Sequence, residues 1–184
     1  MNPTVESGEN SEEFSQLLSG WYMNIFEFAM QMEKDGENYY RRLAQDTDSQ
    51  AVRTVLTMLA DDEVKHFEAI AKMQQASQKP QMADTAIIDK AKNIFADLKA
   101  SDEKFDFDDG QVGLYKKAQQ IEQKSRDFYL EKADETEQSY QKEIFLKLAE
   151  EEKKHFLLLD GLIQFVSRPQ NWLENAEFYH LEDY

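Results

Sequence analysis

An internal repeat with an offset of 89 residues constrains the fold more than any other feature of this sequence. The segment DEVKHF (62–67) returns as EEKKHF (151–156), and MEKDGENYY (32–40) is matched by IEQKSRDFY (121–129) with the same offset and no gap. A repeat of this kind predicts two equivalent structural units. We expect a pseudo-twofold axis between them, near which equivalent residues meet.

Each repeat unit is predicted to be a helical hairpin. Six Gly and three Pro among 184 residues indicate a mostly helical chain, and no segment shows sustained strand-like alternation. Short polar breaks rich in Asp, Thr and Ser suit the turn within each hairpin. Long helices are expected at about 18–46, 49–77, 110–136 and 138–167, and a shorter amphipathic helix at 84–100.

The domain organisation follows from these helices. We expect an all-α four-helix bundle of two hairpins with a long crossover connection, preceded by a flexible acidic lead and followed by a short C-terminal helix. The boundaries are 1–17 for the lead, 18–77 for the first hairpin, 78–109 for the crossover, 110–167 for the second hairpin and 168–184 for the C-terminal segment.

The repeated Glu and His residues lie on the apolar stripes of their helices. In the fourth long helix, Glu152 and His155 continue, in steps of three and four, a row that leads on to Leu159. The second helix repeats this pattern, and the first and third helices each place one Glu on the stripe. The candidate core set is therefore Glu33, Glu63, His66, Glu122, Glu152 and His155. The adjacent charged residues are expected mostly to face water: Asp61, Asp62, Lys65, Glu150, Glu151, Lys153 and Lys154.

Four ionised carboxylates in one apolar core require compensation. Each buried charge costs several kcal/mol even after relaxation, and the carboxylates also repel one another. Two divalent cations would balance four negative charges, and a Glu and a His three residues apart on a helix can bind the same ion. We therefore predict a dinuclear metal site. The alternative is a bundle whose carboxylates are protonated or paired with other groups.

Tyr40 and Tyr129 occupy equivalent places, two helical turns beyond Glu33 and Glu122 on the same faces. A tyrosine on such a stripe can simply be a core residue. Because both are duplicated beside buried carboxylates, we expect their hydroxyl groups to hydrogen-bond to candidate ligands.

Composition excludes several other classes of site and partner. The chain has no cysteine, so any metal must be bound by oxygen and nitrogen ligands. A net charge of −16 argues against nucleic-acid binding. No apolar run approaches the roughly 20 residues that cross a bilayer, and the acidic start is unlike a secretory signal. We expect no membrane association and a cytoplasmic location.

The sequence resembles the ferritin-like superfamily and, more narrowly, the di-iron domain of rubrerythrin. Four segments carry the resemblance, which extends over about residues 20–167: MEKDGENYY (32–40), DDEVKHF (61–67), IEQKSRDFY (121–129) and EEEKKHF (150–156). It implies a ferritin-like bundle, a carboxylate-bridged centre of two iron ions and a homodimer. Members of this family reduce hydrogen peroxide or dioxygen with electrons from a rubredoxin-like iron–sulfur protein or domain.

The resemblance also implies a role for each candidate residue. Glu63 and Glu152 would bridge the two ions, and Tyr40 and Tyr129 would orient ligands. The full set of metal ligands would be Glu33, Glu63, His66, Glu122, Glu152 and His155. Iron or manganese suits redox chemistry, and zinc could occupy the same ligands.

Two departures from the family pattern alter these expectations. Without cysteine, the chain cannot carry a rubredoxin module, so a reductase of this kind needs an external electron donor. Typical rubrerythrins also have an additional Glu one turn after the ligand of the third helix, where it exchanges with a His as the iron changes oxidation state. Here this position is Ser125, matched by Gly36. Small residues at both places would leave space for a peroxide or a diatomic ligand.

Three functions are compatible with these residues. The first is a di-iron peroxidase or oxidase. The second is a ferroxidase or iron-handling protein of the ferritin-like superfamily. The third is a non-catalytic protein that retains the metal pair for stability.

Overall fold

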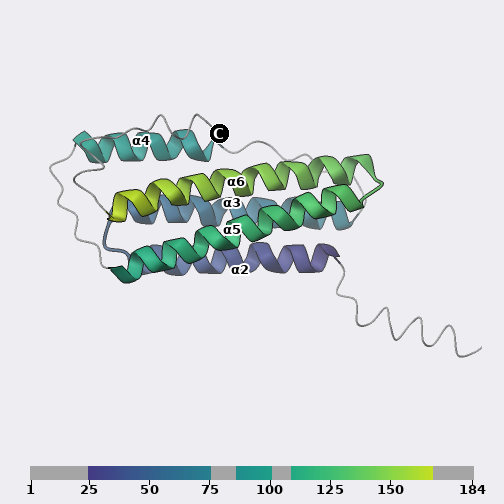
Figure 1. The fold of residues 1–184 in the computed structure, drawn as a ribbon, viewed down its shortest axis with the longest axis horizontal. Helices are drawn as coiled ribbons and strands as arrows, with labels where there is room; N and C mark the ends of the chain where they lie inside the picture. Colours follow the sequence, from purple (N-terminus) through teal and green to yellow (C-terminus); the bar gives the residue numbers. More distant parts are fainter. Residues whose placement is uncertain (1–24, 76–85, 101–108, 168–184) are drawn as a thin grey trace, which may run out of the picture.

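The structure, a computed structural model, describes residues 25–75, 86–100 and 109–167. These residues form five α-helices and no strands (Figure 1), which confirms the predicted all-α bundle. The helices are α2 (Ile25–Asp46), α3 (Gln50–Gln74), α4 (Ile87–Ala100), α5 (Asp109–Glu135) and α6 (Ser139–Ser167). The predicted start of the first helix at 18–24, the lead and the C-terminal segment lie outside the described residues.

The turn between α2 and α3 is held by its own polar side chains. Ser49 caps α3, because its hydroxyl accepts a hydrogen bond from the backbone N–H of Val52 at 3.4 Å. The guanidinium of Arg53 donates to the carbonyl oxygens of Ala44 and Thr47, at 3.1 Å and 2.6 Å. These bonds satisfy carbonyl groups at the end of α2 and fix the hairpin.

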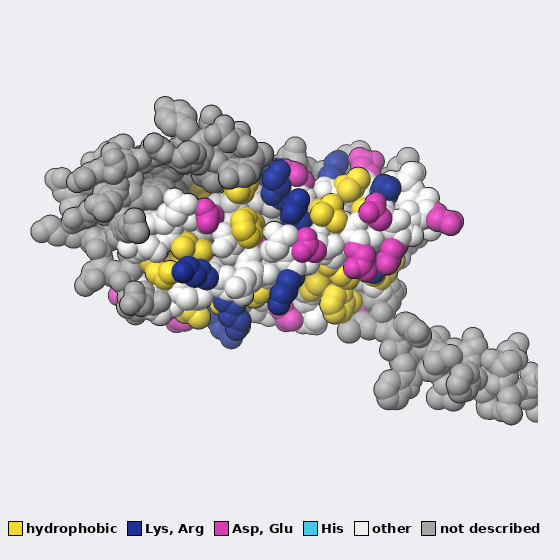
Figure 2. All heavy atoms as spheres, viewed as in Figure 1, with side chains coloured by type: hydrophobic (Ala, Val, Ile, Leu, Met, Phe, Trp, Pro, Cys, Tyr) yellow, Lys and Arg dark blue, Asp and Glu magenta, His cyan; other side chains and the backbone are white. Residues whose placement is uncertain are grey.

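The two hairpins pack into a bundle with a long connection between them. Helix α2 pairs with α3 and α5 pairs with α6, while α2 also contacts α5 and α3 contacts α6. Helix α4 belongs to the crossover and lies against α3 and α6 on the outside of the bundle (Figure 1). On the surface seen in the same direction, Lys and Arg side chains lie among hydrophobic ones (Figure 2).

The apolar core consists of two clusters, one on each side of a polar layer. Along α3, the first cluster includes Leu56 and Leu59, the second includes Ile70 and Met73, and Glu63 lies between them. Helix α4 adds Ile87 and Ala91 to the first cluster. The polar layer is thus closed at both ends by hydrocarbon, which keeps bulk water away.

Among the described helices, none combines the length and the apolar composition that crossing a membrane requires.

Replacement of Leu59 by alanine tests the first core cluster. Leu59 is fully buried, so Leu59→Ala should lower the free energy of unfolding by about 2–5 kcal/mol. Leu146 is 44% exposed, and Leu146→Ala should change it by no more than about 0.5 kcal/mol. Urea denaturation measures both values. Similar losses for the two variants would contradict this core assignment.

Candidate metal centre

Each of the four bundle helices contributes to one buried polar cluster. Helices α2 and α5 supply one carboxylate each, and α3 and α6 supply one carboxylate and one imidazole each. All six side chains are buried: Glu33, Glu63, His66, Glu122, Glu152 and His155. The structure therefore brings together every candidate ligand that the sequence pattern selects.

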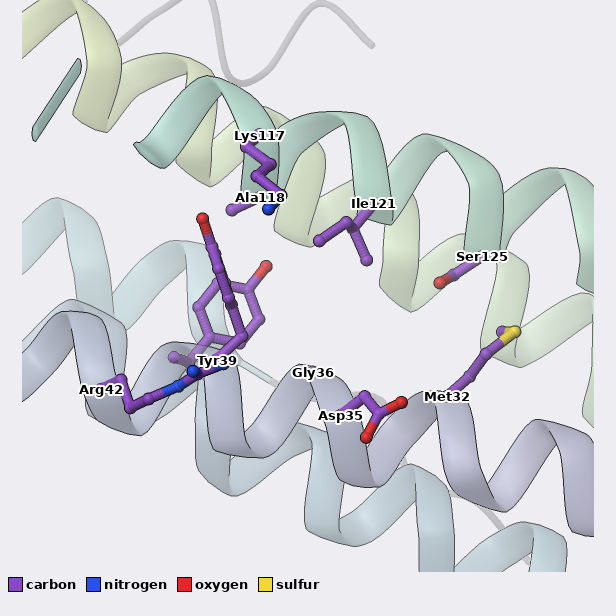
Figure 3. A pocket seen from close by; sticks show the side chains of 10 residues that line it. Met32, Asp35, Gly36, Tyr39, Arg42, Lys117, Ala118, Ile121 and Ser125 are labelled. Carbon is purple, nitrogen blue, oxygen red and sulfur yellow. The ribbon is translucent and has the colours of Figure 1, made fainter. Parts of the chain in front are cut away.

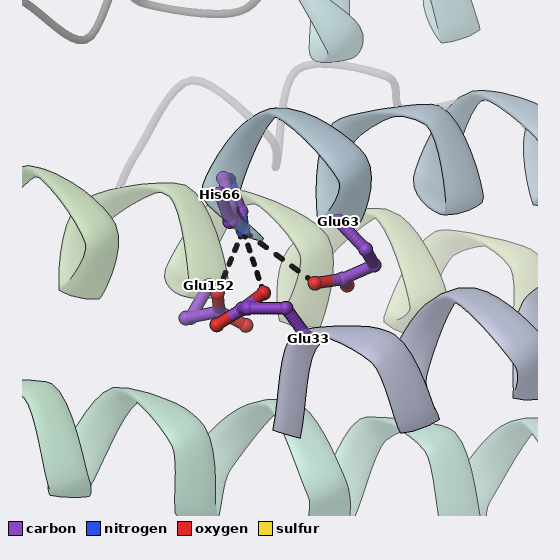
Figure 4. Close-up of side chains that lie close together, drawn as sticks. All are labelled: Glu33, Glu63, His66 and Glu152. Carbon is purple, nitrogen blue, oxygen red and sulfur yellow. Dashed lines mark hydrogen bonds and ion pairs between the residues drawn. The ribbon is translucent and has the colours of Figure 1, made fainter. Parts of the chain in front are cut away.

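The first group of potential ligands surrounds His66 (Figure 4). Its Nδ1 atom lies 3.1 Å from Glu152 Oε1, 3.2 Å from Glu33 Oε2 and 3.5 Å from Glu63 Oε2. One ligand atom from each of these four residues lies within 4.8 Å of all the others. The group draws on α2, α3 and α6, so it exists only when both hairpins are assembled.

The second group surrounds His155 in the same way. Its Nδ1 atom lies 3.3 Å from Glu63 Oε1 and 3.6 Å from Glu122 Oε2, and Glu152 completes the group. The imidazole rings of His66 and His155 are stacked with centroids 5.3 Å apart. Glu63 and Glu152 belong to both groups, which is the arrangement that two carboxylates bridging a pair of ions would have.

Unsatisfied buried atoms show that the cluster fits a metal pair. Glu152 Oε1 and His155 Nδ1 are buried and have no hydrogen-bond partner among the described residues. Buried polar atoms of this kind normally have a partner. Carboxylates and neutral imidazoles are good ligands for iron, manganese and zinc. The residues present therefore fit two divalent cations.

Two tyrosine hydroxyls tie the hairpins together at this layer. Tyr40, on α2, donates a hydrogen bond to Glu122 Oε1, and Tyr129, on α5, donates to Glu33 Oε1. Each hydroxyl thus reaches the carboxylate of the opposite hairpin. Both tyrosines are buried, so these bonds hold the carboxylates in defined orientations.

Asp62 and Glu151 are both buried. The expectation from the sequence that they face water was therefore wrong. They are equivalent under the 89-residue repeat and directly precede the shared carboxylates. Helices α3 and α6 pack against each other, and Asp62 on α3 lies close to His155 on α6. Asp62 Oδ2 lies 3.7 Å from Nε2 of His155. A negatively charged Asp62 at this place would favour a proton on Nε2, which would leave Nδ1 for a metal.

A lysine one helical turn further on neutralises each of these two acids. Lys65 donates to Asp62, and Lys154 donates to Glu151 Oε1 at 2.7 Å. In the sequence, both repeats contain an acid followed three residues later by a lysine, and this pattern was the available signal. Helical spacing alone did not show that the two acids are buried.

The electrostatics of the cluster show how strongly it resists carrying four negative charges. Burial and the neighbouring Glu63 raise the pKa of Glu33 to about 8. Burial and the carboxylates of Glu122 and Glu63 hold the pKa of Glu152 well above its usual range. Without a cation, protons on Glu33 and Glu152 therefore neutralise part of the negative charge that a metal would otherwise balance.

The shifts of the two imidazoles and of Glu63 favour their charged forms, whereas those of Glu33 and Glu152 favour the neutral form. Burial lowers the pKa of His66 and His155, but the surrounding carboxylates outweigh it and hold both well above the usual value. Burial raises the pKa of Glu63, but the neighbouring carboxyl group of Glu33 and the two nearby imidazoles outweigh it and lower this pKa. Burial also raises the pKa of Asp62, which His155 and Lys65 nevertheless bring down to about 2.

Gly36 gives Glu63 the space it occupies. A Cβ atom at position 36 would lie 3.3 Å from Glu63 Cδ, which is tighter than an ordinary contact. Gly36 and its repeat partner Ser125 also line a cavity between α2 and α5 (Figure 3). The small residues noted in the sequence therefore border an open space beside the cluster.

A four-helix bundle with a long crossover and a buried cluster of this composition defines the ferritin-like class. Within that class, the rubrerythrin family model matches residues 24–104, in agreement with the sequence motifs. The matched segment includes Glu33, Glu63 and His66, and the 89-residue repeat relates the second hairpin to it. Comparison with curated proteins and with solved structures finds no significant match.

Replacement of Gly36 by alanine tests the contact with Glu63. The added methyl group should displace the Glu63 carboxylate and weaken metal binding by about tenfold. Competition between the protein and a chelator for Zn²⁺ measures this affinity.

Gly161→Ala is the matched control, because a Cβ atom there meets nothing within 4 Å. This variant should keep the affinity and gain about 0.5–1 kcal/mol of stability from the better helix former. Equal affinities for both variants would disprove the role assigned to Gly36.

The stability of the metal-free protein should depend on pH in a direction set by the raised pKa values. Four residues have pKa values above their usual ones: Glu33, Glu152, His66 and His155. Their contribution to the stability of the folded protein is therefore full below the usual pKa values and is lost as the pH rises above them. Glu63 and Asp62 act in the opposite sense, but only below their usual values of 4.5 and 3.8. The melting temperature of the metal-free protein should therefore fall between about pH 5 and pH 8.

Zn²⁺ should reverse this trend, because metal ions compete with protons for the same atoms. Thermal denaturation of both forms across this pH range provides the measurement. Glu33→Gln should flatten the metal-free profile, whereas Glu27→Gln, at an exposed position of the same helix, should not. A melting temperature that rises with pH in the metal-free protein would refute this account.

Proposed function

We propose that the chain is a non-haem di-iron oxidoreductase that reduces hydrogen peroxide or dioxygen with electrons from an external donor. The observation that supports this most strongly is the pair of four-residue groups that share Glu63 and Glu152. The match of residues 24–104 to the rubrerythrin family model supports the same class of chemistry.

The ligand assignment follows the two groups. Glu33 and His66 would bind one ion, Glu122 and His155 the other, and Glu63 and Glu152 would bridge them. Two iron ions are proposed, because reduction of an O–O bond requires metals that change oxidation state. Manganese could serve similarly, and zinc would occupy the same ligands without redox activity. When bound, the metal pair would supply two electrons and stabilise negative charge on oxygen.

The residues around the site would support this chemistry by holding the proposed ligands in place. The hydroxyls of Tyr40 and Tyr129 donate to Glu122 and Glu33 and so hold these carboxylates in place. Asp62 would set the tautomer of His155. The two apolar clusters limit access of water from either end of the bundle, which strengthens electrostatic interactions within the layer.

The electrons must come from outside this chain. Without cysteine it cannot bind an iron–sulfur cluster through thiolates, so we propose a rubredoxin-like protein as the donor. We further propose a homodimer as the working assembly, as the family resemblance implies.

Anaerobic titration with Fe²⁺, followed by stopped-flow reaction with peroxide and with dioxygen, tests the proposal. We expect two iron ions per chain and oxidation by one of the two substrates much faster than that of free Fe²⁺. The double variant Glu63→Gln and Glu152→Gln should lose this stoichiometry, because both proposed bridges become neutral.

Glu68→Gln with Glu150→Gln is the matched control, since both residues are exposed on the same two helices. Oxidation no faster than that of free iron would disprove the reductase. An assembly of many copies that stores the oxidised iron would instead indicate an iron-handling protein, and sedimentation would detect it.

A further inference from the structure

A cavity of about 420 Å³ lies between α2 and α5, next to the proposed metal centre. In Figure 3, Ile121 points from α5 into this space, and the ring of Tyr39 rises from α2 toward Ala118. The cavity is lined by Met32, Asp35, Gly36, Tyr39, Tyr40, Arg42, Lys117, Ala118, Ile121 and Ser125.

The inner wall of the cavity is one layer away from the proposed ligands. Gly36 lines it and lies directly against Glu63, since even a Cβ atom at this position would approach the Glu63 carboxylate to 3.5 Å at Oε1. Tyr40 also lines it and donates its hydroxyl hydrogen bond to Glu122. A molecule in the cavity would therefore lie beside Glu63 and Glu122 of the cluster.

The volume of this cavity is too large to be explained by hydrogen peroxide or dioxygen. A water molecule occupies roughly 30 Å³ in the liquid, and a peroxide molecule only about twice as much. Cavities of about 300–1,000 Å³ are typical sites for organic ligands. The space between α2 and α5 falls in this second range.

The lining has the chemistry of a site for an amphipathic anion. Met32, Ala118 and Ile121 provide an apolar wall. Arg42 and Lys117 carry positive charge, and each lies over the ring of Tyr39, at 5.8 Å and 5.9 Å from its centroid. Asp35, the acidic residue of the lining, already accepts a hydrogen bond from Gln31.

The repeat shows that the end of the cavity formed by Tyr39 and Lys117 has no counterpart at the equivalent place in the bundle. The 89-residue offset relates Lys117 to Phe28 and Tyr39 to Phe128. At this equivalent place the rings of Phe28 and Phe128 contact each other, with centroids 5.2 Å apart. A cation and a tyrosine thus border the cavity where the other half has two packed aromatic rings.

We propose that this cavity binds an organic hydroperoxide that carries an anionic group, as a substrate of the reductase proposed above. Its hydrocarbon part would lie against Met32 and Ile121, its charged group beside Lys117 and Arg42, and its O–O bond toward Gly36. In the reaction, ROOH takes up two electrons and two protons, the O–O bond breaks, and ROH and water form. The electrons come from the external electron-carrier protein through the metal pair.

Kinetics with the para-carboxylate of cumene hydroperoxide and with hydrogen peroxide test this specificity. Ile121→Trp should fill the cavity and lower the ratio of kcat/KM for the organic substrate to that for hydrogen peroxide by about tenfold. Leu146→Trp, the same type of change at an exposed leucine of α6, should leave the ratio unchanged. An unchanged ratio in Ile121→Trp would overturn the proposal.

The charged group is tested by a second pair of variants. Lys117→Gln should raise KM for the carboxylate substrate about threefold, the size expected for an exposed ion pair, but not for neutral cumene hydroperoxide. Lys116→Gln removes the same charge from an exposed neighbour that does not line the cavity, and should not change either value. Equal effects of the two variants would show that the lysine acts only through the overall charge.

Binding of the product separates this proposal from the proposed function. The alcohol formed from the carboxylate substrate should bind to the Zn²⁺-loaded protein in ligand-observed NMR, and Ile121→Trp should abolish the signal. Binding without any peroxide reduction would support the cavity as a site but disprove the reductase. No binding of the alcohol, or equal binding to Ile121→Trp, would refute the site itself.

Discussion

The structure depends on one electrostatic constraint, which is the presence of four carboxylates in a single buried layer. Glu33, Glu63, Glu122 and Glu152 approach one another from four helices, in a region that hydrocarbon closes on two sides. Such a layer is stable only if positive charge, protons or metal ions enter it. The raised pKa values of Glu33 and Glu152 show how strongly the fold opposes leaving these charges uncompensated.

The same constraint explains why the two hairpins are joined so closely at this layer. Tyr40 and Tyr129 each cross from one hairpin to a carboxylate of the other, and each proposed ion would be bound by residues of both hairpins. Metal binding would therefore be coupled to assembly of the bundle. A cation would stabilise the folded state because no part of the unfolded chain presents these ligands together.

The two hairpins are alike in their cluster residues but differ in the residues around the cluster. The six residues of the cluster repeat faithfully between the hairpins, as two equivalent metal positions would require. Around them the pairs differ: Lys117 and Tyr39 border an open cavity, whereas Phe28 and Phe128 pack together. The two sides of the proposed centre thus have different surroundings, which suits a site that admits its substrate from one side.

The sequence by itself determined the helices, their pairing into hairpins and the six residues of the cluster, because helical periodicity places side chains on a stripe and the repeat matches the stripes. Three features were decided only by the tertiary structure. Asp62 and Glu151, which helical spacing alone had assigned to the surface, are buried, and Asp62 lies beside His155 of α6. The crossing of the hairpins selects which carboxylate each tyrosine reaches, and the separation of α2 and α5 opens the cavity. These features depend on distances between helices, and the periodicity of one helix contains no information about such distances.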